Sequence, residues 1–177
     1  MTETLFQALA LWPEGLSQGQ LWRLWTGHLA HVSWQHLLGN LAALAALLAL
    51  GDRRCSPVEG LGLVIIGPLL ISLYLLWARP ELVWYAGASG MTHLLLARQC
   101  CRLPLRWAVM TWGLLLGKLW LETRTTPWLH HAEIVHEAHW AGVALGLLFG
   151  LWRLRASKQA TSRRPTEVVV YCAHGQA

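Results

Sequence analysis

Five apolar segments alternate with short polar connections along most of this chain. They cover about residues 34–50, 60–77, 86–97, 105–121 and 138–152. A helix needs about 20 apolar residues to cross a bilayer, with about 17 as the lower end of the range. The third and fifth segments are shorter, so we expect them to lie shallow or to carry polar flanks that sit inside protein. The pattern predicts an all-α, polytopic membrane helix bundle with five spans.

The composition adds that lipid must cover much of the surface. Hydrophobic residues make up 55% of the chain and charged residues 13%, about half the charged share of soluble domains. The chain also contains 12 Trp residues, whose indole rings favour the membrane–water interface. The lipid bilayer is therefore a predicted partner.

The net charge of +5 could suggest nucleic acid, but the distribution of the basic residues argues against it. They form short clusters beside the apolar segments, which is the pattern that sets membrane orientation. Ten of the 14 fall on one side of the predicted membrane. That side is expected to be cytoplasmic, so the first, third and fifth segments run inward from the outer face. We expect a disordered, basic cytoplasmic tail over residues 154–177, and we expect reduced thiols without disulfides.

Polar residues inside spans are costly and therefore mark candidate functional sites. His36 and Asn40 lie four residues apart at the start of the first segment, and Ser89 and His93 have the same spacing at the start of the third. His139 opens the fifth segment. Because these three segments all run inward, their polar groups can meet at one level just below the outer surface.

This set of side chains predicts nucleophilic catalysis. A serine needs a base to become a nucleophile, and a neutral histidine can serve near pH 7. We expect Ser89 to attack and His139 to be the base. A carboxylate usually orients such a histidine, but Asp52 is on the wrong side and Glu133 and Glu137 belong to a loop. The sequence therefore predicts a dyad.

Other residues of the three segments can bind the oxyanion and the substrate. His36 and Asn40 offer side-chain N–H donors. The small residues Gly87 and Gly90 let backbone and substrate approach Ser89 closely. A stripe of glycines four residues apart on the fifth segment predicts close contact with the third segment. The stripe consists of Gly142, Gly146 and Gly150.

Several other histidines have more than one possible role. His93 either bonds a backbone carbonyl or supports His139 or the substrate. His31 is expected to order the external loop by hydrogen bonding, and His28 to be a solvated loop residue. A metal site is disfavoured because no His-Glu-x-x-His motif is present and the cysteines are remote. The residues that raise this question are His130, His131, Glu133, His136 and His139. No metal, nucleotide or other cofactor is predicted.

Together these motifs resemble the rhomboid family of intramembrane serine proteases. The residues that carry the resemblance are Trp22-Arg23, His31, His36 and Asn40, Gly87 to Gly90, and His139, Gly142 and Gly146. The resemblance implies that Ser89 attacks, that His139 is the base, and that His36 and Asn40 help bind the oxyanion. It implies membrane-anchored protein substrates, which are cleaved in or near a transmembrane segment.

Two departures from the usual family pattern narrow the resemblance. The position one turn after the serine is usually Tyr or Phe, but here it is His93, and Gly-Ala-Ser-Gly-x-x-His is similar to the rhombosortase branch. That branch implies processing of C-terminal Gly-Gly anchors of exported proteins at the bacterial inner membrane. Bacterial rhomboids usually have six spans, whereas this chain starts about where the first would end. Residues 1–33 would then be a truncated first span and an external loop, and residues 34–153 the catalytic domain.

Two other classes of function remain open at this stage. One is a catalytically inactive rhomboid-like protein that binds membrane clients, which a missing first span would favour. The other is a small transporter or channel that uses the polar cluster as a proton or ion path. Loss of function on replacing Ser89 with Ala would favour the protease over both.

Overall fold

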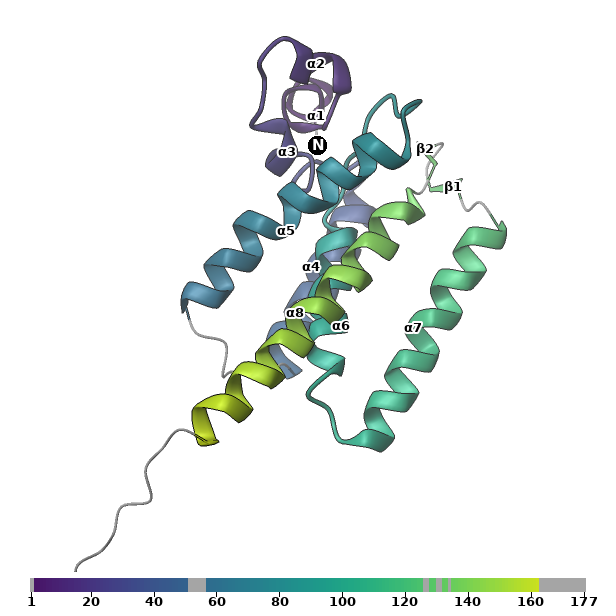
Figure 1. The fold of residues 1–177 in the computed structure, drawn as a ribbon. Helices are drawn as coiled ribbons and strands as arrows, with labels where there is room; N and C mark the ends of the chain where they lie inside the picture. Colours follow the sequence, from purple (N-terminus) through teal and green to yellow (C-terminus); the bar gives the residue numbers. More distant parts are fainter. Residues whose placement is uncertain (1, 51–56, 126–127, 130–131, 134, 163–177) are drawn as a thin grey trace, which may run out of the picture.

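The computed structural model describes residues 2–50, 57–125, 128–129, 132–133 and 135–162. Within these ranges the chain forms eight helices and one very short β-hairpin (Figure 1). The helices are α1 (Glu3–Leu9), α2 (Pro13–Ser17), α3 (Arg23–Thr26), α4 (Trp34–Leu50), α5 (Pro57–Ala78), α6 (Ser89–Cys100), α7 (Leu105–Thr125) and α8 (His136–Ser162). Strands β1 (Trp128–Leu129) and β2 (Ala132–Glu133) pair antiparallel between α7 and α8. Asp52, Cys55, His130, His131, Cys172 and the tail beyond residue 162 lie outside the described residues.

The five apolar segments correspond in order to α4, α5, α6, α7 and α8, so the all-helical prediction is confirmed. The boundaries differ most at α8, which begins at His136 and continues to Ser162. Residues 154–162 are therefore helical, and the prediction of a disordered tail from residue 154 is wrong for this stretch. Its Arg, Lys and Gln residues are good helix formers, which explains why an existing helix continues through polar sequence.

Length and hydropathy qualify one described helix for a membrane crossing, over Glu59–Ala78. A second apolar helix, Trp34–Ala49, is shorter than that criterion requires. Helix α6 has 12 residues, which extend only about 18 Å, and α7 and α8 carry charged side chains within their length. The five-span count therefore stays a prediction, although large apolar side chains cover the outer faces of several helices. Exposed examples are Leu41, Leu48, Val64, Ile65, Leu73, Leu114 and Leu121.

Helix α6 lies at the centre of the bundle. It lies alongside α8, with α5 and α7 on either side of this pair (Figure 1). The glycines of α8 make the close contact possible, as the sequence predicted. A Cβ atom on Gly142 would lie 2.1 Å from the carbonyl oxygen of Gly90, and one on Gly146 would lie 2.1 Å from that of Leu94. These two helices can approach this closely only because both positions lack a side chain.

An ion cluster joins three helices at the end of the bundle remote from Ser89. The Glu59 carboxylate of α5 pairs with Arg98 of α6, and its second oxygen lies 2.9 Å from the Arg153 Nε of α8. Glu59 and Arg98 are both buried. Removing one partner of such a pair would leave an uncompensated buried charge, which is strongly destabilising. Arg98 and Arg153 therefore stabilise the packing of α5, α6 and α8, in addition to any effect on the orientation of the protein in the membrane.

The residues before α4 pack at the end of the bundle where Ser89 lies. Arg23 is buried, and its guanidinium donates to the carbonyl oxygens of Gln7 and Ala10 at 2.8 and 2.7 Å. Leu11 pairs through its backbone with Tyr85, in the segment that leads to Ser89. Helices α1 to α3 are thus connected directly to the chain that enters α6.

Candidate active site

The first turns of α4, α6 and α8 meet at one end of the bundle and line a cavity of about 380 Å³. The sequence predicted that their polar side chains would lie at one level, and this prediction is confirmed. Those lining the cavity include His36, Asn40, Ser89, His93 and His139. Both Asn40 and His139 are nearly inaccessible to solvent, so the polar groups are held inside protein.

Ser89 and His139 are in hydrogen-bonding contact. The His139 Nε2 lies 2.8 Å from the Ser89 Oγ, between the first residue of α6 and the first turn of α8. The ring of His93 stacks on that of His139, with centroids 4.3 Å apart and planes 14° from parallel. The stacking restricts rotation of the His139 ring, so its Nε2 stays directed at the hydroxyl.

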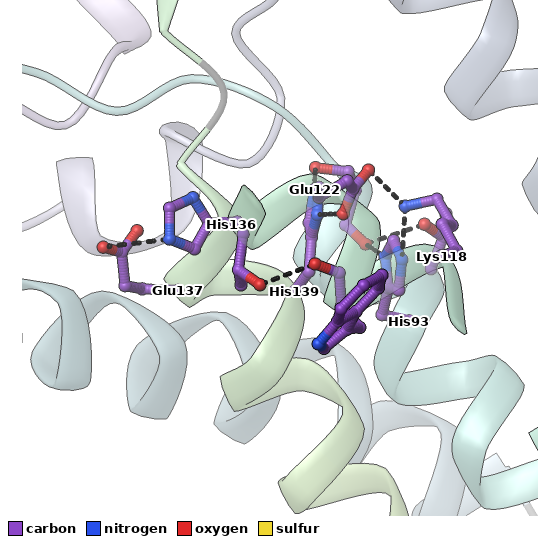
Figure 2. A network of polar contacts seen from close by, with 10 residues as sticks. His93, Lys118, Glu122, His136, Glu137 and His139 are labelled. Carbon is purple, nitrogen blue, oxygen red and sulfur yellow. Dashed lines mark hydrogen bonds and ion pairs between the residues drawn. The ribbon is translucent and has the colours of Figure 1, made fainter. Parts of the chain in front are cut away.

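A carboxylate also contacts His139, so the expectation that none would reach it is wrong. The Glu122 Oε2 lies 2.9 Å from the His139 Nδ1, and the Glu122 Oε1 accepts from the Lys118 Nζ at 2.6 Å (Figure 2). Lys118 and Glu122 belong to the last turns of α7. The fourth apolar segment was predicted to end at about residue 121, whereas α7 extends to Thr125 and therefore includes Glu122. A Lys and a Glu four residues apart near the end of an apolar segment were the available signal.

The sequence left two interpretations of His93 open, a bond to a backbone carbonyl and a contact with His139, and the structure shows both. Its Nδ1 lies 2.6 Å from the Ser89 carbonyl oxygen, one turn earlier in α6, while its ring stacks on His139. Its Nε2 lies 3.1 Å from the Lys118 Nζ (Figure 2). Since an ammonium group can only donate, Nε2 is the acceptor and Nδ1 carries the proton given to the carbonyl.

Gly87 gives the segment before Ser89 an unusual backbone shape. Its φ is +140°, a value that side chains with a Cβ rarely adopt. A Cβ there would lie 2.8 Å from the His36 Cε1, so glycine lets the His36 imidazole lie against the backbone next to Ser89. Tyr85 holds this turn by donating its hydroxyl to the Gly87 carbonyl at 2.7 Å.

Gly90 and Asn40 complete the set of predicted site residues. A Cβ on Gly90 would lie 3.0 Å from the Ala138 carbonyl oxygen, so this glycine serves the α6–α8 contact next to the Ser–His pair. The Asn40 amide donates to the His36 carbonyl oxygen at 3.0 Å. An amide has two N–H donors, so this bond leaves a second for a ligand in the cavity.

His28 was expected to be solvated, and this prediction is wrong. Its side chain is buried, and its Nε2 donates to the Pro68 carbonyl of α5 at 3.1 Å. The Ser72 hydroxyl, 3.1 Å from the same nitrogen, donates to the Leu24 carbonyl at 2.7 Å. The ring also meets Tyr85 edge-on, so His28 supports the residue that holds Gly87.

His31 was expected to form a hydrogen bond within the external loop, and it does. Its Nδ1 lies 2.9 Å from the Leu29 carbonyl oxygen.

The burial of His28 leads to a prediction about stability and pH. Burial lowers its pKa from 6.5 to about 4, so between these values the unfolded chain binds more protons than the folded one. The contribution of His28 to stability should therefore decrease by about 3 kcal/mol as the pH falls from 6.5 towards 4. Thermal unfolding of the detergent-purified protein across this range should show the decrease. In His28→Gln the decrease should be smaller by about the share of His28, whereas in His136→Gln, which keeps His28, the full decrease should persist.

The helical bundle holds a hydrogen-bonded serine–histidine pair in a cavity lined by further polar side chains. A comparison with known families matches residues 18–156 to the Rhomboid domain. The match covers most of the chain, which therefore belongs to the rhomboid family. No curated protein in the comparison matches it. Rhomboid proteins are integral membrane proteins and intramembrane serine proteases that act on membrane proteins within the bilayer.

Proposed function

We propose that this chain is an active intramembrane serine endopeptidase, with Ser89 as the nucleophile and His139 as the general base. The observation that carries the proposal is the 2.8 Å contact between the Ser89 Oγ and the His139 Nε2. It lies in a cavity lined also by His36 and Asn40. The membership in the rhomboid family supports the same chemistry.

The reaction runs in two halves. The Ser89 Oγ attacks the carbonyl carbon of the scissile bond while its proton passes to the His139 Nε2. The tetrahedral intermediate collapses, and the same proton goes to the leaving amine, which gives an acyl-enzyme. A water molecule then gives a proton to Nε2 and attacks the ester. Collapse releases the new carboxyl terminus and returns the proton to Ser89.

The charge that develops on the substrate oxygen needs nearby donors. We assign these to the side chains of His36 and Asn40 and to the Ser89 backbone N–H. The first residues of a helix have unpaired N–H groups, and Ser89 is the first residue of α6. The missing side chain at Gly87 leaves room for the His36 imidazole beside the serine, so a proposed oxyanion donor can lie next to the nucleophile.

We further propose that the substrates are those of a rhombosortase, which are exported proteins with a C-terminal Gly-Gly anchor. The support is His93, which takes the place of the usual aromatic residue one turn after the serine and stacks on His139. The protein would lie in a bacterial inner membrane, with its site near the outer face and its C-terminus in the cytoplasm. The ten-to-four distribution of basic residues supports this orientation.

Cleavage of a membrane-anchored reporter tests both parts of the proposal. The reporter carries Gly-Gly immediately before a single transmembrane segment and is incubated with the protein in liposomes. Wild type should release the soluble part, and Ser89→Ala should not. Replacing Gly-Gly with Ala-Ala should slow release about 30-fold, because two glycines ease helix unwinding by about 2 kcal/mol.

The possible results separate the two parts of this proposal. Equal rates on the Gly-Gly and Ala-Ala reporters would reject the rhombosortase assignment and leave the protease. Reporter that is bound but never cut by folded wild type would instead indicate a client-binding protein without activity.

A further inference from the structure

The carboxylate of Glu122 makes two contacts that fix its position. One oxygen meets the His139 Nδ1 at 2.9 Å, and the other accepts from the Lys118 Nζ at 2.6 Å. The Glu122 side chain is 16% exposed and that of Lys118 is 48% exposed. The lysine is the more exposed partner of this pair, and it also reaches His93 (Figure 2).

We propose that Glu122 is the positioning residue for His139, and that Lys118 holds it in that role, so that the site is a Ser–His–Glu triad whose third member comes from α7. This inference rests on the proposed protease function. It departs from the dyad that the sequence predicted. The third residue comes from α7, whereas Ser89 and His139 belong to α6 and α8.

The tautomer of His139 decides whether this ring can act as the base. To take the proton of Ser89, Nε2 must be unprotonated, and in a neutral imidazole the proton then lies on Nδ1. A carboxylate can only accept, so Glu122 opposite Nδ1 selects this tautomer. When Nε2 gains the proton during attack, the same carboxylate faces the positive charge that forms on the ring.

Lys118 makes the position of Glu122 specific. An ammonium group needs acceptors, and here its partners are the Glu122 Oε1 and the His93 Nε2. These contacts orient the carboxylate so that its other oxygen faces His139. They also connect the position of α7 to that of the two rings stacked between α6 and α8.

Other charged and titratable groups surround the histidine, but they have different partners. On α8 itself, Glu137 pairs with Arg79 at 2.9 Å and lies near His136. From α4, His36 lines the cavity, and its ring meets His31 edge-on. From α6, His93 stacks on the ring without bonding its nitrogens. Among the described residues, Glu122 is the carboxylate in contact with Nδ1.

The arrangement makes Glu122→Gln an informative variant. The amide that this substitution introduces has one accepting and one donating end, and Lys118 requires the accepting end. The NH₂ group would then face Nδ1 and select the tautomer that has its proton on Nε2, which cannot accept from Ser89. We expect the maximal rate of serine phosphonylation by a fluorophosphonate to fall about 100-fold or more, with little change in the half-saturating concentration of the probe.

Two further variants separate positioning from mere structural support. Adding Lys118→Met to Glu122→Gln lets the amide turn its oxygen to Nδ1, so the rate of phosphonylation by the probe should recover several-fold. If Glu122 and Lys118 had only a structural role, removing Lys118 as well should lower the rate further. Glu122→Asp should retain more activity than Glu122→Gln. Glu137→Gln is the matched control, because it removes a half-buried carboxylate at the same end of the bundle without touching His139.

A spectrum of the wild type tests the inference without any dependence on how the glutamate variants fold. In protein with ¹⁵N-labelled histidine, His139 should show a protonated Nδ1 and an unprotonated Nε2, with its signals assigned by their loss in His139→Ala. The opposite tautomer would overturn the inference. So would phosphonylation of Glu122→Gln at the wild-type rate, provided that wild type labels and Ser89→Ala does not. Absence of wild-type labelling would instead contradict the protease function itself.

Discussion

Replacing Ser89 or His139 with Ala should abolish covalent labelling of the purified protein by a fluorophosphonate probe. Such probes phosphonylate only an activated serine, with loss of fluoride, and Ser89 requires removal of its proton by the His139 Nε2, 2.8 Å away. Ser89→Ala removes the attacking oxygen, so its labelling should be zero. His139→Ala removes the base and also the ring on which His93 stacks, so its labelling should fall at least about 1,000-fold.

The measurement is gel fluorescence after incubation of detergent-purified protein with the probe, beside a known rhomboid at the same concentration. Ser17→Ala is the matched control, because Ser17 is a hydroxyl on the short helix α2 that donates to the nearby Glu14 carbonyl. It should label like wild type. Labelling that persists in Ser89→Ala would assign the reactive group to another residue. Folded wild type that stays unlabelled would contradict an active serine.

Replacing Gly142 with Ala should force apart the two helices that hold Ser89 and His139. The new Cβ would lie 2.1 Å from the Gly90 carbonyl oxygen and 3.0 Å from its carbon, distances that backbone atoms do not tolerate. Helices α6 and α8 must therefore separate, and overpacking of this kind costs about 1–3 kcal/mol. Because Gly142 lies one turn after His139, the shift also moves the histidine from Ser89. A displacement of about 1 Å can reduce the rate of catalysis about 100-fold.

Thermal unfolding and fluorophosphonate labelling, measured together, check this prediction. The control variants are Gly113→Ala and Gly117→Ala on α7, where no atom lies within 4 Å of the added Cβ. Each control should leave stability unchanged or raise it by up to about 1 kcal/mol, because Ala favours helix over Gly. Gly142→Ala that is as stable and as reactive as these controls would show that the close α6–α8 contact is not needed.

The sequence was sufficient for those parts of the protein that depend on local pattern. Helix identity follows from five apolar segments, and α4 has the predicted bounds of residues 34–50. The meeting of His36, Ser89 and His139 follows from the shared direction of three helices, which alternation across a membrane imposes. The glycine stripe of α8 predicted its contact with α6, since only small residues permit such an approach.

The tertiary structure decided the contacts that depend on how helices are rotated against one another. A Lys118–Glu122 pair four residues apart could equally face water, and the rotation of α7 is what directs Glu122 to His139. His28 looked like a loop residue until the packing of α3 on α5 placed it beside Pro68 and Ser72. The reason is the same in both cases. Periodicity along the chain shows which face of a helix is apolar, whereas the partner of a polar side chain depends on distances between segments far apart in sequence.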